Sequence, residues 1–398
     1  MDSRARGTVE VATAFLKLGL TSFGGPVAHI GYFRAEFVRR RAWLDDAAFA
    51  DLVGLCQFLP GPASSQTAMA LGYLRAGAPG AAAAWVAFTA PSAILMILFA
   101  LALLSGAEVF NGTVAVSVVH GLKLVAVPIV AQAVCSMART LCPDIPRASI
   151  AVLCAALMLI VPGALVQIIA LMIGAIAGFA VLRGADAATK PLPIAVPRSV
   201  GVICLGAFAM LLALLPLARP LSPLLALSDA MYRSGALVFG GGHVVLPLLR
   251  EAIVAPGWLS DETFLAGYGA AQAVPGPLFT VAAFIGMLAQ QPSAGAPGAG
   301  ISLVMIFLPG VLILFGALPF WSRIHAAPGA RRALLGLNAA VVGILAAALY
   351  TPVSITAITS WSDAAIAAAA FGLLMLRRTA PWMVVAGVVA AVVITRAV

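Results

Sequence analysis

Two apolar stretches of the chain are interrupted by the same helix-breaking triplet, and polar side chains flank each interruption. The triplets are Pro60-Gly61-Pro62 and Pro275-Gly276-Pro277, and a glutamine, Gln57 or Gln272, stands three residues before each. Proline has no backbone N–H to donate, so the helix that enters each triplet must end there. The half-helix that follows offers free N–H groups and the positive end of its dipole, which favour anions. The pattern therefore predicts two related anion sites.

Hydroxyl side chains lie in the first turn of each half-helix. Ser64 and Ser65 follow the first triplet, and Thr280 follows the second at the position of Ser65. Together with Gln57 and Gln272, these hydroxyls are the predicted hydrogen-bonding groups for a ligand. Broken helices persist in hydrocarbon only where they are buried in protein or line a wet cavity. A plain proline kink is the competing interpretation.

Few basic residues lie inside apolar stretches, which makes their positions informative. Lys17 and Arg233 each precede a Phe-Gly-Gly sequence by six residues, and Lys123 lies within another apolar stretch. Burying a cation costs between ~3 and ~15 kcal/mol, depending on snorkelling and water access. These cations are therefore predicted to attract an anion, and Asn338, the counterpart of Lys123, is assigned to the same site. Snorkelling of Lys17 and Arg233 to the membrane surface is the alternative.

Glycines form a second kind of interruption. Gly24-Gly25 and Gly240-Gly241 are predicted helix breaks, and His243, which follows the latter, is assigned to the ligand site. Glycine permits unwinding or a close approach of the backbone. Close helix packing is the competing interpretation for both sequences.

Acidic residues within apolar stretches are scarcer still. Asp51 is the most deeply embedded, and Ala266 replaces it in the second half of the chain. Asp51 is the predicted carrier of a coupling proton, or the partner of a cation. A site rich in cations and helix N-termini and poor in carboxylates favours a compact oxyanion as its ligand.

The motifs recur because the chain contains an internal duplication. Residues 36–62 match residues 251–277 at ten of 27 positions, and Gly121-Leu122-Lys123 recurs as Gly336-Leu337-Asn338. The two Phe-Gly-Gly sequences, which precede these stretches, align when a gap of one residue is introduced. The predicted organisation is an N-terminal repeat (1–183), a linker with one extra membrane segment (184–226) and a C-terminal repeat (227–398).

The composition is that of a membrane protein. The 398 residues are 63% hydrophobic and 9% charged, against roughly 25% charged in soluble proteins. A helix needs about 20 apolar residues to cross the bilayer, so the chain is predicted to be an all-α polytopic membrane protein with about thirteen transmembrane segments. The segments are 9–31, 47–73, 81–105, 113–138, 148–162, 164–182, 199–217, 229–250, 262–288, 300–320, 331–351, 361–376 and 381–396.

The odd segment between two sets of six would place the homologous halves in opposite orientations, as in many secondary transporters. Most Arg and Lys residues fall on one side when the N-terminus is cytoplasmic. The cluster Arg34, Arg39, Arg40 and Arg41 then falls outside. Either the first two segments re-enter and keep this cluster inside, or the cluster is an external funnel for an anion.

Other classes of site find little support in the sequence. The net charge of +9 is attributed to loop arginines, so no nucleic-acid partner is expected. The five cysteines have no paired spacing and the four histidines are scattered, so no metal site or other cofactor is predicted. No cleavable signal peptide is evident at the start of the sequence.

The motifs together resemble the chromate transporter family. The resemblance lies in residues 15–26, FLKLGLTSFGGP, in residues 57–62, QFLPGP, and in their second copies at 239–243 and 272–277. It implies a bacterial inner-membrane protein with antiparallel homologous halves. It also implies export of chromate driven by the proton-motive force, with sulfate, a near-isostere, as a competitor.

The sequence thus predicts a multi-pass secondary transporter, not an enzyme, that exports chromate and confers chromate resistance. Its partners are chromate or sulfate and the lipid bilayer, and a homodimer is left open. Uptake or exchange of sulfate is the alternative within this class. A membrane enzyme acting on a lipid phosphate, with Asp45-Asp46 near Arg39 to Arg41, and a passive channel are the rivals from other classes.

Overall fold

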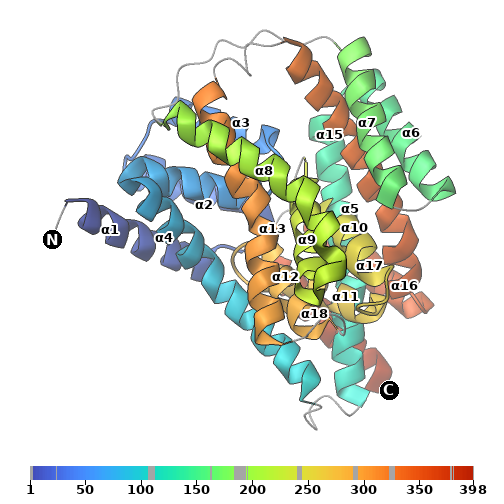
Figure 1. Ribbon diagram of the computed structural model, residues 1–398. Coiled ribbons are helices and arrows are strands. Elements are labelled where there is room, and N and C mark those ends of the chain that lie inside the picture. The colour runs from blue at the N-terminus through green and yellow to red at the C-terminus, as the bar shows by residue number, and fades with distance from the viewer. Residues whose placement is uncertain are drawn as a thin grey trace.

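The computed structural model describes residues 3–23, 25–105, 113–161, 164–182, 194, 196–239, 244–289, 295–321, 328–376, 379 and 381–397. All regular secondary structure in these ranges is helical (Figure 1). Five helices within them are long and apolar enough to cross a membrane: Ala63–Leu104, Val116–Leu141, Arg198–Leu221, Ala296–Phe320 and Arg331–Ala357. An all-helical polytopic membrane protein is therefore confirmed, while the count of thirteen segments and the inversion of the repeats stay predictions.

The helices follow the order of the duplicated sequence. The first half contains α1 (Ser3–Thr21), α2 (Gly25–Phe33), η1 (Arg34–Arg40), α3 (Asp46–Phe58), α4 (Ala63–Leu104), α5 (Thr113–Leu141), α6 (Ile145–Ile160) and α7 (Ala164–Val181). Then come α8 (Arg198–Ala218) and η3 (Arg219–Leu221). The second half contains α9 (Pro223–Ala236), α10 (Val245–Leu249), η5 (Arg250–Val254), α11 (Asp261–Ala273), η6 (Leu278–Thr280), α12 (Val281–Leu288), α13 (Ala296–Ala317), η7 (Leu318–Phe320), α15 (Pro328–Ala348), η8 (Leu349–Ser354), α16 (Ile355–Ala357), α17 (Trp361–Met375) and α18 (Pro381–Ala397).

The long helix α4 consists of two arms. The backbone leaves helical geometry at Ala76 and Gly77, and Gly77 has a φ of 67°. Gly72 in the first arm packs against Gly80 and Ala84 in the second, so the arms fold back on each other. In the second half, α12 and α13 pair in the same way, and both pairs rely on small residues for close backbone approach.

The two halves interlock. The long helix α5 packs against α17 and α18, and its counterpart α15 packs against α6 and α7 (Figure 1). Gly174 and Gly178 on α7 face Gly336 on α15 so closely that a side chain at any of the three would collide with the facing backbone. Each half therefore completes the core of the other.

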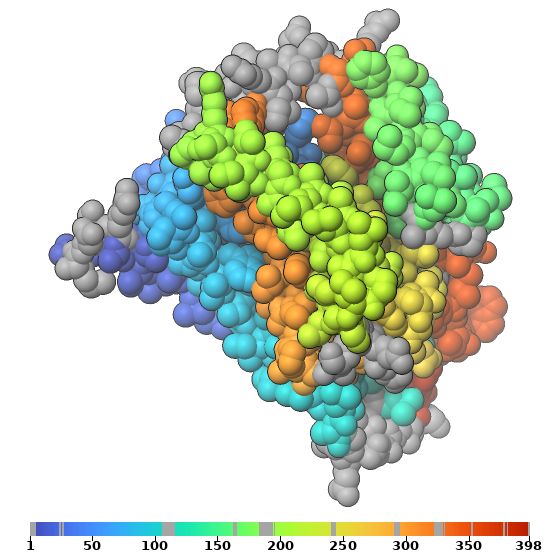
Figure 2. Space-filling model, in the orientation of Figure 1, coloured from blue at the N-terminus to red at the C-terminus, as the bar shows by residue number. Residues whose placement is uncertain are grey.

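The extra helix α8 lies at the periphery. It packs against α13 and α9 on one side, and Figure 2 shows it as a yellow-green band across the face of the molecule, beside the orange α13. Its other side exposes large apolar side chains such as Val202, Ile203 and Met210. Such a surface on a helix long enough to cross the bilayer is suited to contact with lipid.

The structure distinguishes between the two interpretations of the arginine cluster. Glu10 on α1 accepts hydrogen bonds from Arg41 at 3.0 Å and from Arg75 at 2.7 Å. One carboxylate that binds both arginines places Glu10, Arg41 and Arg75 at the same end of the molecule. The chain returns to this end between Glu10 and Arg41, and returns to it again between Arg41 and Arg75. This geometry favours the re-entrant interpretation over the external funnel.

Ion pairs also neutralise most of the cluster. Arg34 pairs with Asp46 at 2.7 Å, and Arg40 pairs with Glu36 at 2.9 Å. Burial raises the pKa of Glu36, but hydrogen bonds from Arg41 and Arg40 outweigh it and hold this pKa below its ordinary value. The carboxylate therefore stays ionised and occupies these guanidinium groups.

Candidate functional site

Both Pro-Gly-Pro triplets interrupt helices, as the sequence predicts. α3 ends at Phe58 and α4 begins at Ala63, with Gly61 between them at a φ of 118°. The second triplet separates α11 from η6 in the same way, and Gly276 there has a φ of 102°. Glycine adopts this region of φ without strain, so each triplet combines a forced helix end with a turn that suits glycine.

Each triplet is held by the other repeat. The N–H of Gly61 donates to the carbonyl oxygen of Val238 at 2.7 Å, and the N–H of Gly276 donates to that of Ser22 at 3.0 Å. Ser22 and Val238 occupy equivalent positions, each directly before a Phe-Gly-Gly sequence. The broken helices of the two repeats are thus joined by exchanged, equivalent hydrogen bonds.

Gln66 fixes the first triplet against the second half of the chain. Its Nε2 donates to the carbonyl oxygens of Pro60 at 2.9 Å and Gly310 at 3.0 Å, and its side chain is fully buried. A Cβ added to Gly61 would lie 2.9 Å from the Cα of Gly310, so the contact is tight. Gln66, one turn into α4, thus caps the broken helix.

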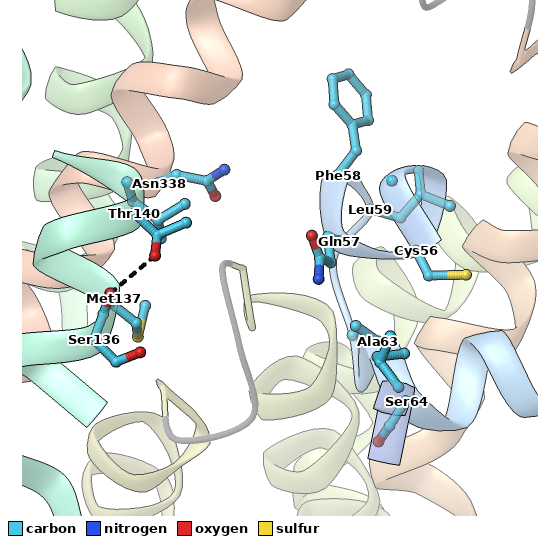
Figure 3. A pocket seen from close by; sticks show the side chains of 14 residues that line it. Cys56, Gln57, Phe58, Leu59, Ala63, Ser64, Ser136, Met137, Thr140 and Asn338 are labelled. Atoms are coloured by element: carbon cyan, nitrogen blue, oxygen red, sulfur yellow. Dashed lines mark hydrogen bonds between the residues drawn. The ribbon is translucent and has the colours of Figure 1, made fainter. Parts of the chain in front are cut away.

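A cavity of about 300 Å³ opens beside this triplet (Figure 3). A water molecule occupies ~30 Å³ in the liquid, so the cavity has room for a tetrahedral anion and several waters. Figure 3 shows Gln57 and Ser64 on one wall, facing Ser136, Thr140 and Asn338 on the other. The remaining lining residues are Ile30, Gly54, Cys56, Phe58, Leu59, Gly61, Ala63, Met137 and Leu141.

The polar groups of this cavity are neutral hydrogen-bonding groups drawn from four helices. Gln57 lies on α3, Ser64 in the first turn of α4, Ser136 and Thr140 on α5, and Asn338 on α15. The structure thus brings together three of the predicted site residues, Gln57, Ser64 and Asn338. Amide and hydroxyl donors at the start of a helix are suited to an anion, because the helix dipole adds to their hydrogen bonds.

A smaller cavity of about 100 Å³ adjoins the first and shares Ser136 and Thr140 with it. This second cavity adds Arg139, an exposed cation, and Gln132. Sequence reasoning did not assign the α5 residues to the site. A pattern in the sequence could have indicated these residues. Ser136, Arg139 and Thr140 form a polar helix face near the end of an apolar stretch.

Lys123 lies elsewhere on α5 and already has a partner. Its Nζ donates to the Oε1 of Glu262 at 3.2 Å, and its side chain is 7% exposed. Thirteen residues separate it from Ser136, which amounts to roughly 20 Å along a helix. One turn earlier, His120 contacts the carboxylate of Asp363 at 3.0 Å, and both side chains are buried. Lys123 therefore belongs to a polar cluster distant from the cavity.

Lys17 and Arg233 are also outside the cavity. Lys17 is exposed on α1. Arg233 lines a different cavity, of about 350 Å³, where it pairs with the buried Asp229 at 2.7 Å, and Arg219 lies 3.6 Å from the same carboxylate. The structure does not bring the two cations to one site, so their shared role in attracting an anion is a hypothesis that the following substitutions test.

Some of the other predicted residues lie within the described ranges and some lie outside them. Ser65 and Gln272 are buried, and Ser65 Oγ and Gln272 Nε2 have no hydrogen-bond partner among the described residues, whereas the Thr280 hydroxyl donates to the carbonyl of Pro277 at 2.8 Å. Asp51 is half-buried on α3, and Gly25 begins α2. Outside the described residues lie Gly24, Gly240, Gly241 and His243.

Replacing Lys17 or Arg233 with alanine tests whether both cations attract the anion. Lys17→Ala is expected to keep oxyanion transport, because Lys17 is exposed on α1 and lines neither large polar cavity. Arg233→Ala is expected to lower it, because the buried carboxylate of Asp229 loses its closest partner. Initial transport rates, normalised to inserted protein, measure both. An equal loss of transport in the two variants would support a shared role for the two cations.

Comparisons with known proteins agree with the motifs. The chromate transporter family model matches residues 9–182 and 225–394. The chromate transport protein of Pseudomonas aeruginosa is 28% identical over 86% of this chain and 80% of its own length. The chromate transport protein of Cupriavidus metallidurans is 27% identical over 87% and 85%.

A transporter of uncharacterised substrate from Methanocaldococcus jannaschii is 27% identical over 85% of this chain and 83% of its own. No solved structure matches the chain. The family model covers both copies of the duplicated motifs and nearly all of the helices described above. The chain therefore belongs to the chromate transporter family.

Proposed function

We propose that this protein is a secondary transporter that exports chromate across a bacterial inner membrane, driven by the proton-motive force, and so confers chromate resistance. Family membership supports the substrate class. The single structural observation that carries the proposal is the cavity of neutral amide and hydroxyl groups at the start of α4. Chromate is a tetrahedral dianion, and such a site can hydrogen-bond its oxygens from several directions.

The proposal includes two inverted repeats that alternate access to the site. The exchanged hydrogen bonds of Gly61 and Gly276 support a pseudo-twofold relation between the halves, and inverted repeats of this kind are common in secondary transporters. A cytoplasmic N-terminus is also proposed. Arg41 of the cluster and Arg75 both bind Glu10, so they lie on one side of the membrane. Cytoplasmic loops carry an excess of Arg and Lys, which favours the cytoplasm as that side.

Uptake of radiolabelled chromate into inverted membrane vesicles tests this function. Vesicles with the protein are expected to accumulate chromate when energised, and an uncoupler is expected to abolish the accumulation. Excess sulfate is expected to reduce it, since a neutral site distinguishes two tetrahedral dianions poorly. Movement of sulfate alone, insensitive to uncoupler, would instead identify a sulfate carrier or channel.

Asp51→Asn tests the proposed proton carrier. Asp51 lies half-buried on α3, six residues before Gln57 on the wall of the cavity. The amide cannot exchange a proton, so the variant is expected to lose the pH dependence of energised transport. Initial rates measured across an imposed pH gradient check this. Asp51→Glu, which keeps a carboxyl group, is the control expected to retain the pH dependence. An unchanged pH profile in Asp51→Asn would assign the proton to another group.

A further inference from the structure

The two repeats place equivalent glycines in unlike surroundings. Gly54 on α3 and Gly269 on α11 occupy matched positions in the duplicated stretch. A Cβ added to Gly269 would collide with the carbonyl oxygen of Leu122, so α11 packs directly against α5. Gly54 instead lines the 300 Å³ cavity, and a Cβ added there would meet no neighbouring atom within 4 Å. The same helix surface is covered in one repeat and open in the other.

The helices facing these glycines are equivalent too. Leu122 on α5 aligns with Leu337 on α15, directly before Asn338. Asn338 lies across the cavity from α3 (Figure 3), whereas its counterpart Lys123 lies where α11 meets α5. One copy of the helix pair is therefore closed and the other is open.

A charged pair spans the closed copy, between the buried Lys123 and the largely exposed Glu262. Lys123 on α5 donates to Glu262 in the first turn of α11 at 3.2 Å. The aligned residues in the open copy are Asn338 and Ala47, which cannot form an ion pair. The closed copy thus carries a latch that the open copy lacks.

We propose that the two copies are the two gates of one transport cycle and that the Lys123–Glu262 pair latches the gate that is closed in this structure. The proposal rests on the transport function proposed above. In the alternate state, α3 packs against α15 through Gly54, and α11 leaves α5. The cavity beside Gln57 then closes, and a second vestibule opens in the C-terminal repeat.

The second vestibule is suited to the same class of ligand. Lys123 loses Glu262 when α11 moves away, and an oxyanion takes the place of that carboxylate beside the ammonium group. Gln272, which is 8% exposed, offers an amide whose Nε2 has no partner within the described part of the chain. Lys123 therefore attracts the anion only when this gate is open, which links substrate binding to release of the latch.

The substitution Gly54→Leu tests the gate without disturbing the present state, because the added side chain enters open space. It is expected to block closure of α3 on α15, so transport into vesicles falls about tenfold or more, a barrier increase of ~1.4 kcal/mol. Because Gly54 lines the cavity, the added side chain also occupies part of it, so the cross-linking experiment below separates blocked closure from blocked binding. Gly206→Leu on α8, also in open space, is the matched control. Transport at the parental rate by Gly54→Leu would overturn the proposal.

Cross-linking gives a readout that needs no substrate. Cysteines introduced by Gly54→Cys and Leu337→Cys, in a protein that also carries Cys56→Ala, are expected to form a disulfide under a mild oxidant as α3 closes on α15. Gly206→Cys with Leu337→Cys is the control pair. A cross-link in a protein that fails to move chromate overturns the transport assignment and supports the gate. The absence of a cross-link in a protein that does move chromate overturns the gate.

The latch itself is tested by Glu262→Gln in a protein that carries Gln272→Cys. Removing the carboxylate frees Lys123, so α11 is expected to leave α5 more often. Labelling of the new cysteine by a membrane-impermeant maleimide is then expected to rise several-fold. Unchanged labelling would show that the pair is not the latch.

Discussion

A protein with Pro60→Ala and Pro62→Ala together is expected to insert in the membrane but to lose transport, with the initial rate lowered about tenfold or more. Alanine restores two backbone N–H groups and removes the steric bar to a continuous helix. The turn at Gly61, which bonds to Val238 of the other repeat, would then compete with helix formation. Losing that turn moves Ser64 and the first turn of α4 away from the cavity.

Pro146→Ala is the matched control for this pair of substitutions. Pro146 also stands at the start of a helix, α6, but it is exposed and lines none of the cavities described above. Its removal is expected to leave transport close to the parental rate. If the Pro60 and Pro62 variant moved chromate normally in energised vesicles, the break would be a simple kink with no part in the site.

Gln66→Leu is expected to destabilise the protein more than any substitution of a residue that only lines the cavity. The leucine removes the amide that donates to the carbonyl oxygens of Pro60 and Gly310. The carbonyl oxygen of Gly310 lies inside α13 and keeps its helical partner, so the main cost comes from the carbonyl of Pro60. A buried acceptor without a partner lowers the free energy of unfolding by ~1–3 kcal/mol. Thermal unfolding in detergent measures the loss.

Gln132→Leu provides the comparison for Gln66→Leu. Gln132 makes a single, longer hydrogen bond of 3.3 Å to the carbonyl oxygen of Leu374, at a part-buried position. We expect its substitution to lower the unfolding temperature much less. Equal shifts in the two variants would mean that water or another side chain satisfies the carbonyl of Pro60.

The local breaks could be predicted from the sequence because their causes are local. A single proline does not end a helix here, since Pro128 lies inside α5 and Pro309 inside α13. The triplet combines two prolines, which remove two backbone donors, with a glycine that suits a turn with positive φ. The duplication then pointed to an equivalent break at Gly276. Gln57, Ser64 and Asn338 line one cavity, and their role in binding a ligand stays a prediction.

The arginine cluster shows where a local rule was insufficient. Counting apolar stretches left two possibilities for residues 9–31 and 47–73, which either cross the membrane or re-enter on the side from which they start. The shared contacts of Glu10 with Arg41 and Arg75 return the chain to the same end each time. Two long-range ion pairs favour re-entry, and Glu10 lies 31 and 65 positions from its two partners.

The sequence by itself determined the membrane class, the duplication, the helix breaks and the family, because each depends on residue types at short or repeated spacing. Only the tertiary structure decided which polar groups share a cavity. α5 and α15 exchange partners between the halves, which brings Ser136 and Thr140 to Gln57 and turns Lys123 toward Glu262. Two equivalent sequences pack differently: α11 contacts α5, whereas α3 faces α15 across the cavity, and the sequence assigns the same contacts to both.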